Sequence, residues 1–110
     1  MAGITVYGIP NCDVTRKLIR WLKVNNIEFS FHDYKISGIS KTKLAEWCKR
    51  KGMEQLLNKR GTTWKNIPEA EKEAITDLPA AVNLMAANTS LIKRPVIEID
   101  GKLLVGYNEN

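Results

Sequence analysis

The first third of the chain is patterned as a strand, a helix and a second strand, and this order limits the folds open to it. Residues 4–7 form a short β-branched and aromatic run, which a glycine and a proline close. Apolar side chains then recur at helical spacing over residues 13–24 until two asparagines end the pattern. Residues 28–33 alternate, as a half-buried strand does. This unit predicts a parallel strand pair joined by a right-handed crossover.

The middle of the chain is patterned for helices. Residues 41–51 carry Leu44, Trp47 and Cys48 on one face, with lysines on the opposite face. Further helices are expected over residues 53–57, 69–75 and 80–87. Trp47 and Trp64 are expected to pack within this region rather than to bind a ligand. Since no low-complexity linker interrupts the pattern, no second domain is indicated.

The chain ends in a pattern typical of a β-hairpin. Two short apolar runs, residues 96–99 and 102–105, flank Asp100 and Gly101, a pair that favours a tight hairpin turn. Strand, helix, strand, helices and hairpin is the element order of a thioredoxin-like fold. We therefore expect an α/β protein with a central mixed four-stranded sheet. It would form a single domain over residues 1–110, with a helical insertion at about 40–90.

Composition excludes several classes of protein. The chain has 110 residues, of which 44% are hydrophobic and 26% charged, as in one ordinary globular domain. No apolar run approaches the roughly 18 residues of a membrane span, and no export signal is evident, so we expect a cytoplasmic protein that does not enter membranes. Two cysteines and one histidine are too few for a disulfide framework or a Cys/His zinc cluster, so no metal is expected. A net charge of +5 suits an anionic partner, but no motif indicates nucleic-acid binding.

Cys12 stands where the first strand gives way to the first helix. The free N–H groups and the positive dipole end of a helix start favour a thiolate over a thiol. Arg16 and Lys17 add positive charge one turn on, and the Thr15 hydroxyl could donate to the sulfur. The simpler alternative is a small residue that only packs, but a position at the carboxyl end of a strand favours a nucleophile. Cys48 is expected to be a packed or partly exposed bystander.

Thr15 occupies the third position after the nucleophile, where dithiol oxidoreductases carry their resolving cysteine. If Cys12 attacks an oxidised sulfur, an outside thiol must then resolve the mixed intermediate, and glutathione is the obvious candidate.

Four stretches resemble one known family. VYGIPNCDVTRK, FSFHDYKISGI, LLNKRGTTWK and KRPVIEIDGKLLVGY resemble the arsenate reductase (ArsC) family of thioredoxin-like proteins, in particular its YffB-like branch of small reductases. The stretches cover almost the whole chain and keep the order and spacing of the family. The family also includes Spx-like proteins, which regulate transcription by binding RNA polymerase.

The resemblance implies roles for five residues. Cys12 matches the catalytic cysteine, with Thr15 in support, and Arg60 and Arg94 match arginines that bind the substrate oxyanion and stabilise the thiolate. Pro95 matches a cis-proline beside the active site. A guanidinium group binds a carboxylate or a tetrahedral oxyanion through two parallel hydrogen bonds, which is a physical reason for arginine at both positions. Without the family pattern, we would expect Arg60 to be a solvated turn residue and Arg94 to be a charge that flanks a strand.

The resemblance implies a monomeric, glutathione-dependent thiol reductase. Glutathione would be the co-substrate and glutaredoxin a candidate protein partner, with no metal or tightly bound cofactor. Arsenate reductases of the family carry a further arginine just after the last strand, where this chain has Gly106 and Tyr107, so arsenate reduction is less favoured. Relatives usually continue into a final helix beyond the position of Asn110.

A second hypothesis is an interaction module. Basic helical residues over 41–51 would suit an acidic protein face, and an Spx-like regulator would bind RNA polymerase without turning over a substrate. Spx-like redox switches, however, carry a second cysteine at the position of Thr15. His32, on the polar face of the second strand, is expected to be simply exposed rather than catalytic.

Overall fold

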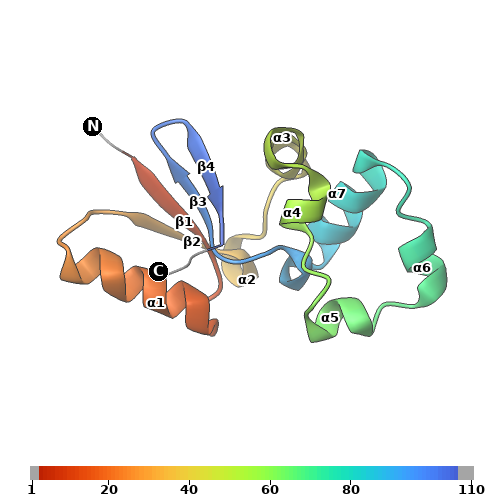
Figure 1. Ribbon diagram of the computed structural model, residues 1–110, viewed down its shortest axis with the longest axis horizontal. Helices are drawn as coiled ribbons and strands as arrows, with labels where there is room; N and C mark the ends of the chain where they lie inside the picture. Colours follow the sequence, from red (N-terminus) through yellow and green to blue (C-terminus); the bar gives the residue numbers. More distant parts are fainter. Residues whose placement is uncertain (1–2, 107–110) are drawn as a thin grey trace. The chain divides into compact units, whose positions relative to one another are not determined.

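A computed structural model describes residues 3–106 as parts of two compact units. We call them the sheet unit, made of residues 3–37 and 94–106, and the helical unit, Gly38–Lys93 (Figure 1). The helical unit corresponds closely to the insertion expected at about 40–90. Organisation of the whole chain as a single domain stays a prediction. From residue 3 to residue 106, the structure contains no helix with the length and apolar character needed to cross a membrane.

The sheet unit contains the mixed four-stranded sheet that the sequence predicts. Its elements are β1 (Ile4–Gly8), α1 (Asp13–Val24), β2 (Ser30–Asp33), α2 (Tyr34–Ser37), β3 (Val96–Ile99) and β4 (Lys102–Val105). The strands lie in the order β2-β1-β3-β4. β1 pairs parallel with β2, while β3 is antiparallel to both β1 and β4. The predicted parallel pair and the terminal hairpin are both confirmed.

One face of this sheet packs against α1 (Figure 1). Val6 and Ile97 from the strands form a buried cluster with Leu18 and Leu22 from the helix. Fully burying one such side chain stabilises a fold by about 1.5–3 kcal/mol, so this cluster holds α1 to the strands. Because side chains alternate along a strand, the residues between these apolar positions belong to the opposite face of the sheet.

The hairpin between β3 and β4 turns at Asp100 and Gly101 as expected. Both residues have positive φ angles, 48° and 79°. Positive φ at both central residues is the requirement of a type I′ turn, whose twist matches that of the flanking strands.

The helical unit consists of short helices around a small apolar centre. It contains α3 (Lys41–Lys51), α4 (Met53–Leu56), α5 (Thr62–Lys65), α6 (Glu69–Glu73), α7 (Leu78–Ala87) and the 3₁₀ turn η1 (Thr89–Leu91). Trp47 is completely buried, as the sequence predicts, together with Leu44, Leu56 and Met85. Backbone bonds also join distant parts of the unit, from Lys93 N–H to the Leu56 carbonyl over 2.8 Å and from Asn58 N–H to the Leu91 carbonyl over 2.7 Å.

Several boundaries differ from the sequence prediction. β2 begins at Ser30 rather than at residue 28, because the ladder with β1 starts with the pair Thr5 and Ser30. α7 begins at Leu78 rather than at residue 80, because the Asp77 side chain caps it. The short elements α2, α5 and η1 were not predicted, since a single turn is too short to show a hydrophobic period.

Removal of the Asp77 cap should weaken the helical unit. The Asp77 carboxylate accepts a hydrogen bond from the Ala80 N–H over 3.0 Å. We expect Asp77→Ala to lower the free energy of unfolding by about 1 kcal/mol in chemical denaturation, because it leaves that N–H unsatisfied. Asp77→Ser restores a capping oxygen and is the matched control. An alanine variant as stable as wild type would contradict this role.

Candidate active site

Cys12 is the N-cap residue of α1. Its backbone is extended, with φ −113° and ψ 124°, and its carbonyl accepts the first helical hydrogen bond from the Arg16 N–H over 2.9 Å. The side chain is half-buried. β1 ends at Gly8, so the loop that follows brings the thiol to the carboxyl edge of the parallel strand pair, as the sequence predicts.

The surroundings of Cys12 favour the thiolate. Burial raises the pKa of the Cys12 thiol, but this effect is outweighed by hydrogen-bond donors. The Thr15 N–H and hydroxyl, the Arg94 side chain and the Val14 N–H all lower the pKa, and the net direction is below the ordinary value. These donors are two backbone groups of a helix start and two side chains, which stabilise a negative sulfur and do little for a neutral one.

Thr15 is enclosed beside this sulfur. Its side chain is completely buried, and its hydroxyl oxygen has no hydrogen bond of ordinary geometry to any group in residues 3–106. Its influence on Cys12 therefore acts over a longer contact, as a dipole whose attraction grows when the sulfur becomes negative. Burial of a hydroxyl without a regular hydrogen-bond partner lowers the stability of most proteins.

Gly8 leaves the space that Thr15 occupies. A Cβ atom placed on Gly8 would lie 2.8 Å from the Thr15 hydroxyl oxygen and 3.2 Å from its methyl carbon. Both distances are shorter than van der Waals contact, and Thr15 is completely buried, so close packing resists its displacement. The glycine therefore permits the close approach of β1 and the first turn of α1.

Arg94 and Pro95 lie just before β3. The Arg94 side chain reaches the Cys12 sulfur, and the peptide bond between Arg94 and Pro95 is cis, as the resemblance implies. Pro95 is buried, and its carbonyl accepts a hydrogen bond from the Gly106 N–H over 2.7 Å. The structure thus brings Cys12, Thr15, Arg94 and Pro95 together in the sheet unit.

Arg60 belongs to the helical unit. It lies in an exposed turn, where its N–H donates to the Asn58 side-chain oxygen over 3.1 Å. Nearby Trp64 is half-buried, with the Lys59 and Lys72 ammonium groups 5.6 and 5.2 Å from its ring. Trp64 therefore packs within the helical unit as expected, but it does so between two cations. The role of Arg60 in substrate binding stays a prediction.

A polar aromatic cluster on the sheet face opposite α1 was not anticipated from the sequence. The Tyr7 hydroxyl donates to the Glu98 carboxylate over 2.5 Å. The Tyr7 ring centre lies 4.9 Å from that of His32 and 6.4 Å from that of Tyr34. The expectation that His32 is exposed is wrong, because these rings leave it half-buried. Strand alternation places Tyr7 and His32 on one face, but only the structure adds Tyr34 from α2.

Tyr34 connects this cluster to the thiol. Burial raises the pKa of Tyr34, as do Tyr7 and Glu98, whereas the positive charge of Arg94 opposes them. Its hydroxyl is buried and unpartnered in the part of the chain that the structure describes. The Arg94 charge therefore lowers the pKa of both the Cys12 thiol and the Tyr34 phenol.

Other sequence candidates lie outside this arrangement. Arg16 forms an exposed ion pair with Asp13, so the charges of the two side chains largely cancel. Cys48 is buried in α3, where burial raises the pKa of its thiol, consistent with the expected bystander. Among residues 3–106, no three histidine, cysteine or carboxylate side chains are grouped as a metal site would require. Tyr107 lies outside the described residues.

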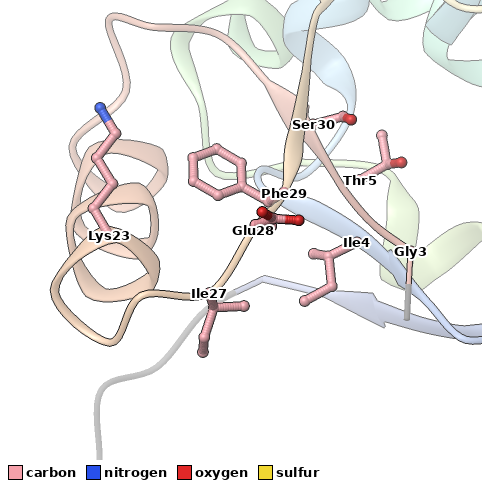
Figure 2. Close-up of a pocket in the computed structure, with 8 residues that line it drawn as sticks. All are labelled: Gly3, Ile4, Thr5, Lys23, Ile27, Glu28, Phe29 and Ser30. Atoms are coloured by element: carbon pink, nitrogen blue, oxygen red, sulfur yellow. The ribbon is translucent and has the colours of Figure 1, made fainter. Parts of the chain in front are cut away.

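A hollow at the opposite end of β1 is separate from the thiol. Figure 2 shows Ile4 and Thr5 of β1 beside Phe29 and Ser30, with Lys23 of α1 on the other side. These residues lie at the beginning of β1, the end of α1 and the start of β2 with the loop before it, whereas Cys12 follows the end of β1 and precedes α1. The hollow therefore contributes nothing to the candidate active site.

Comparison with known proteins decides the family. A model of the ArsC family matches residues 7–110. The chain belongs to the ArsC family. A solved structure of a YffB protein is 42% identical, with a TM-score of 0.90, over 96% of this chain and 91% of that one. An arsenate reductase (ArsC) related protein from Brucella melitensis is 43% identical, with a TM-score of 0.79, over 97% and 88%.

Two curated proteins are similar to this chain over nearly its whole length. An uncharacterised protein of Haemophilus influenzae is 45% identical over 106 residues, which are 96% of this chain and 92% of the relative. The global transcriptional regulator Spx of Streptococcus pyogenes is 27% identical, over 97% of this chain and 80% of the regulator. The similarities confirm the thioredoxin-like ArsC fold and the likeness to both YffB and Spx proteins.

Loss of the Arg94 charge should raise the pKa of the Cys12 thiol. In wild type the rate of iodoacetamide alkylation, which follows the thiolate, should rise with pH to a midpoint below that of a free cysteine. We expect Arg94→Gln to move this midpoint upward and to slow alkylation below it by about tenfold, the effect of losing one charged hydrogen bond. Lys17→Gln, which removes an equal charge one turn along α1, is the control. Equal midpoints in wild type and Arg94→Gln would contradict the contact.

A side chain at position 8 should destabilise the protein through Thr15. We expect Gly8→Ala to lower the free energy of unfolding by about 1–3 kcal/mol, as overpacking does. Thr15→Ala removes both atoms within 3.2 Å of the added Cβ, so the double variant should lose less than the sum of the two single losses. Strict additivity in a double-mutant cycle would show that the two residues do not compete for space.

Proposed function

We propose that this chain is a glutathione-dependent thiol reductase with Cys12 as its nucleophile. The observation that supports this most directly is the sulfur at the start of α1, whose pKa is lowered by helix N–H groups and by Arg94. A thiolate attacks disulfide sulfur, which a neutral thiol does not, and a lowered pKa raises the thiolate fraction at a given pH.

The proposed reaction is a pair of thiol exchanges. The Cys12 thiolate attacks the glutathione sulfur of a mixed disulfide, the substrate leaves as a thiolate, and Cys12 becomes glutathionylated. A second glutathione thiolate then attacks the glutathione sulfur on Cys12, which releases the Cys12 thiolate and oxidised glutathione. The glutathione carried by the substrate and one free glutathione leave together as oxidised glutathione, so one free glutathione is consumed for each substrate sulfur that is reduced. In a cell, glutaredoxin could accept the glutathione group in place of the second glutathione.

The requirement for an external thiol rests on the positions of the other polar groups. Thr15 occupies the place where dithiol enzymes keep a resolving cysteine. Cys48 is buried and burial raises the pKa of its thiol, so it is a poor attacking group at neutral pH. In the proposal, Arg94 holds the thiolate and a glutathione carboxylate in turn, and Arg60 binds a second carboxylate of the tripeptide.

A regulatory function is the second candidate. Its support is the similarity to Spx over nearly the whole chain, together with the basic residues of α3. Thr15 argues against a redox switch of the Spx kind, which the family resemblance associates with a second cysteine at this position. Arsenate reduction would use the same thiolate on an oxyanion, and several solved relatives carry that name.

Turnover of a glutathionylated peptide, coupled to glutathione reductase and NADPH oxidation, tests the proposal. We expect Cys12→Ser to abolish turnover and Cys48→Ser to retain it, since only the first removes the activated sulfur. Arg60→Ala should raise the KM for glutathione, by about tenfold if one charged hydrogen bond is lost.

Two results would reject the reductase. Unchanged turnover in Cys12→Ser would show that Cys12 is not the nucleophile. Absence of turnover in wild type, combined with recovery of RNA polymerase on both wild type and Cys12→Ser in a pull-down, would assign the chain to the regulatory class.

A further inference from the structure

A groove with an apolar floor runs along one flank of α1. Its apolar lining, which we call its floor, consists of Ile19 and Val24 of the helix, Phe31 of β2 and Pro10 of the loop before the helix. Its volume is about 570 Å³, comparable to sites that bind side chains or small ligands. Val24, the last residue of the helix, is 73% exposed, so part of this apolar lining is open to solvent. All of these residues belong to the sheet unit.

Cations form the rim of the groove. Arg16, Arg20 and Lys23 follow one another along the helix at intervals of four and three residues, which places them in one row. Arg16 is paired with Asp13. Arg20 and Lys23 make no ion pair with any residue from 3 to 106. Two positive charges without an ion-pair partner in residues 3–106 therefore stand beside an exposed apolar surface.

This combination restricts the occupant. A second copy of the chain would bring the same cations and a net charge of +5 to the interface, which opposes self-association here. The floor is mainly aliphatic, with one half-buried phenylalanine, and so offers no platform on which nucleic-acid bases could stack. A peptide segment that carries both carboxylates and an apolar side chain matches the rim and the floor together.

We propose that the α1 groove, defined by Pro10, Phe31 and residues 16–24, docks an acidic segment of a partner protein with one apolar anchor residue. The anchor enters between Ile19 and Phe31, and flanking carboxylates approach Arg20 and Lys23. Charge complementarity of this kind speeds association and orients the segment along the helix. The proposal does not depend on the reductase chemistry, because Cys12 does not line the groove.

A labelled peptide tests the docking surface. The probe is a fluorescein-labelled dodecapeptide of glutamates and serines with a single central leucine, measured by fluorescence anisotropy against the full chain. We expect the double variant Arg20→Glu with Lys23→Glu to bind at least about tenfold more weakly than wild type. The matched control is Lys41→Glu with Lys49→Glu, which changes the net charge equally on exposed positions of α3 and should keep wild-type affinity.

Two further measurements separate the floor from the rim. A probe with serine in place of leucine should bind more weakly to wild type, since it lacks the anchor. Amide NMR shifts caused by the original probe should fall on residues 16–24 and 31. Circular dichroism melting of each variant establishes that a loss of binding is not a loss of fold.

Four results would overturn the proposal. If the probe does not bind measurably, the groove does not dock an acidic segment with an apolar anchor. Equal weakening by both double variants would show attraction to net charge alone. A wild-type dimer in sedimentation, lost in the α1 variant, would assign the groove to a second copy. Binding to phosphatidylglycerol vesicles that depends on Arg20 and Lys23, without peptide binding, would assign it to an anionic membrane surface.

Discussion

The parallel pairing of β1 with β2 is the constraint on which the site depends. Parallel neighbours require a crossover, and here α1 is that crossover, held to the sheet by its apolar face. The helix must therefore begin beside the carboxyl end of β1. Its first free N–H groups come to the place where Cys12 stands, so the activation of the thiol follows from the topology of the sheet.

Much of the fold and the centre of the site could be predicted from the sequence. Alternation in the strands, the helical period of residues 13–24 and the turn at Asp100 and Gly101 are local signals, and each produced the expected element. Cys12 was identifiable for the same reason, because a helix start and a strand end are both visible in sequence. The cis peptide bond before Pro95 came from family resemblance and not from a local pattern.

The remainder of the site depends on contacts between distant segments. Arg94 is far from Cys12 in sequence, and only the pairing of β3 with β1 brings its side chain to the sulfur. Tyr34 lies in a single helical turn that has no period to detect, yet it completes the cluster with Tyr7 and His32. The half-buried state of His32 depends on those neighbours. Strand alternation predicts which side chains share one face of the sheet, but not which residues of other elements pack against that face.

The close approach of Gly8 and Thr15 has an evolutionary consequence. In the reductase proposed above, Thr15 stands where a dithiol enzyme keeps its resolving cysteine, so resolution is left to another molecule. The missing side chain at Gly8 already provides the room in which the atoms of residue 15 lie. Replacement of threonine by cysteine at this point would exchange the hydroxyl for a sulfur, remove the methyl group and leave the course of the backbone as it is. A change between a self-resolving and a partner-resolved thiol at this position therefore needs only one side chain to change, without rebuilding the fold.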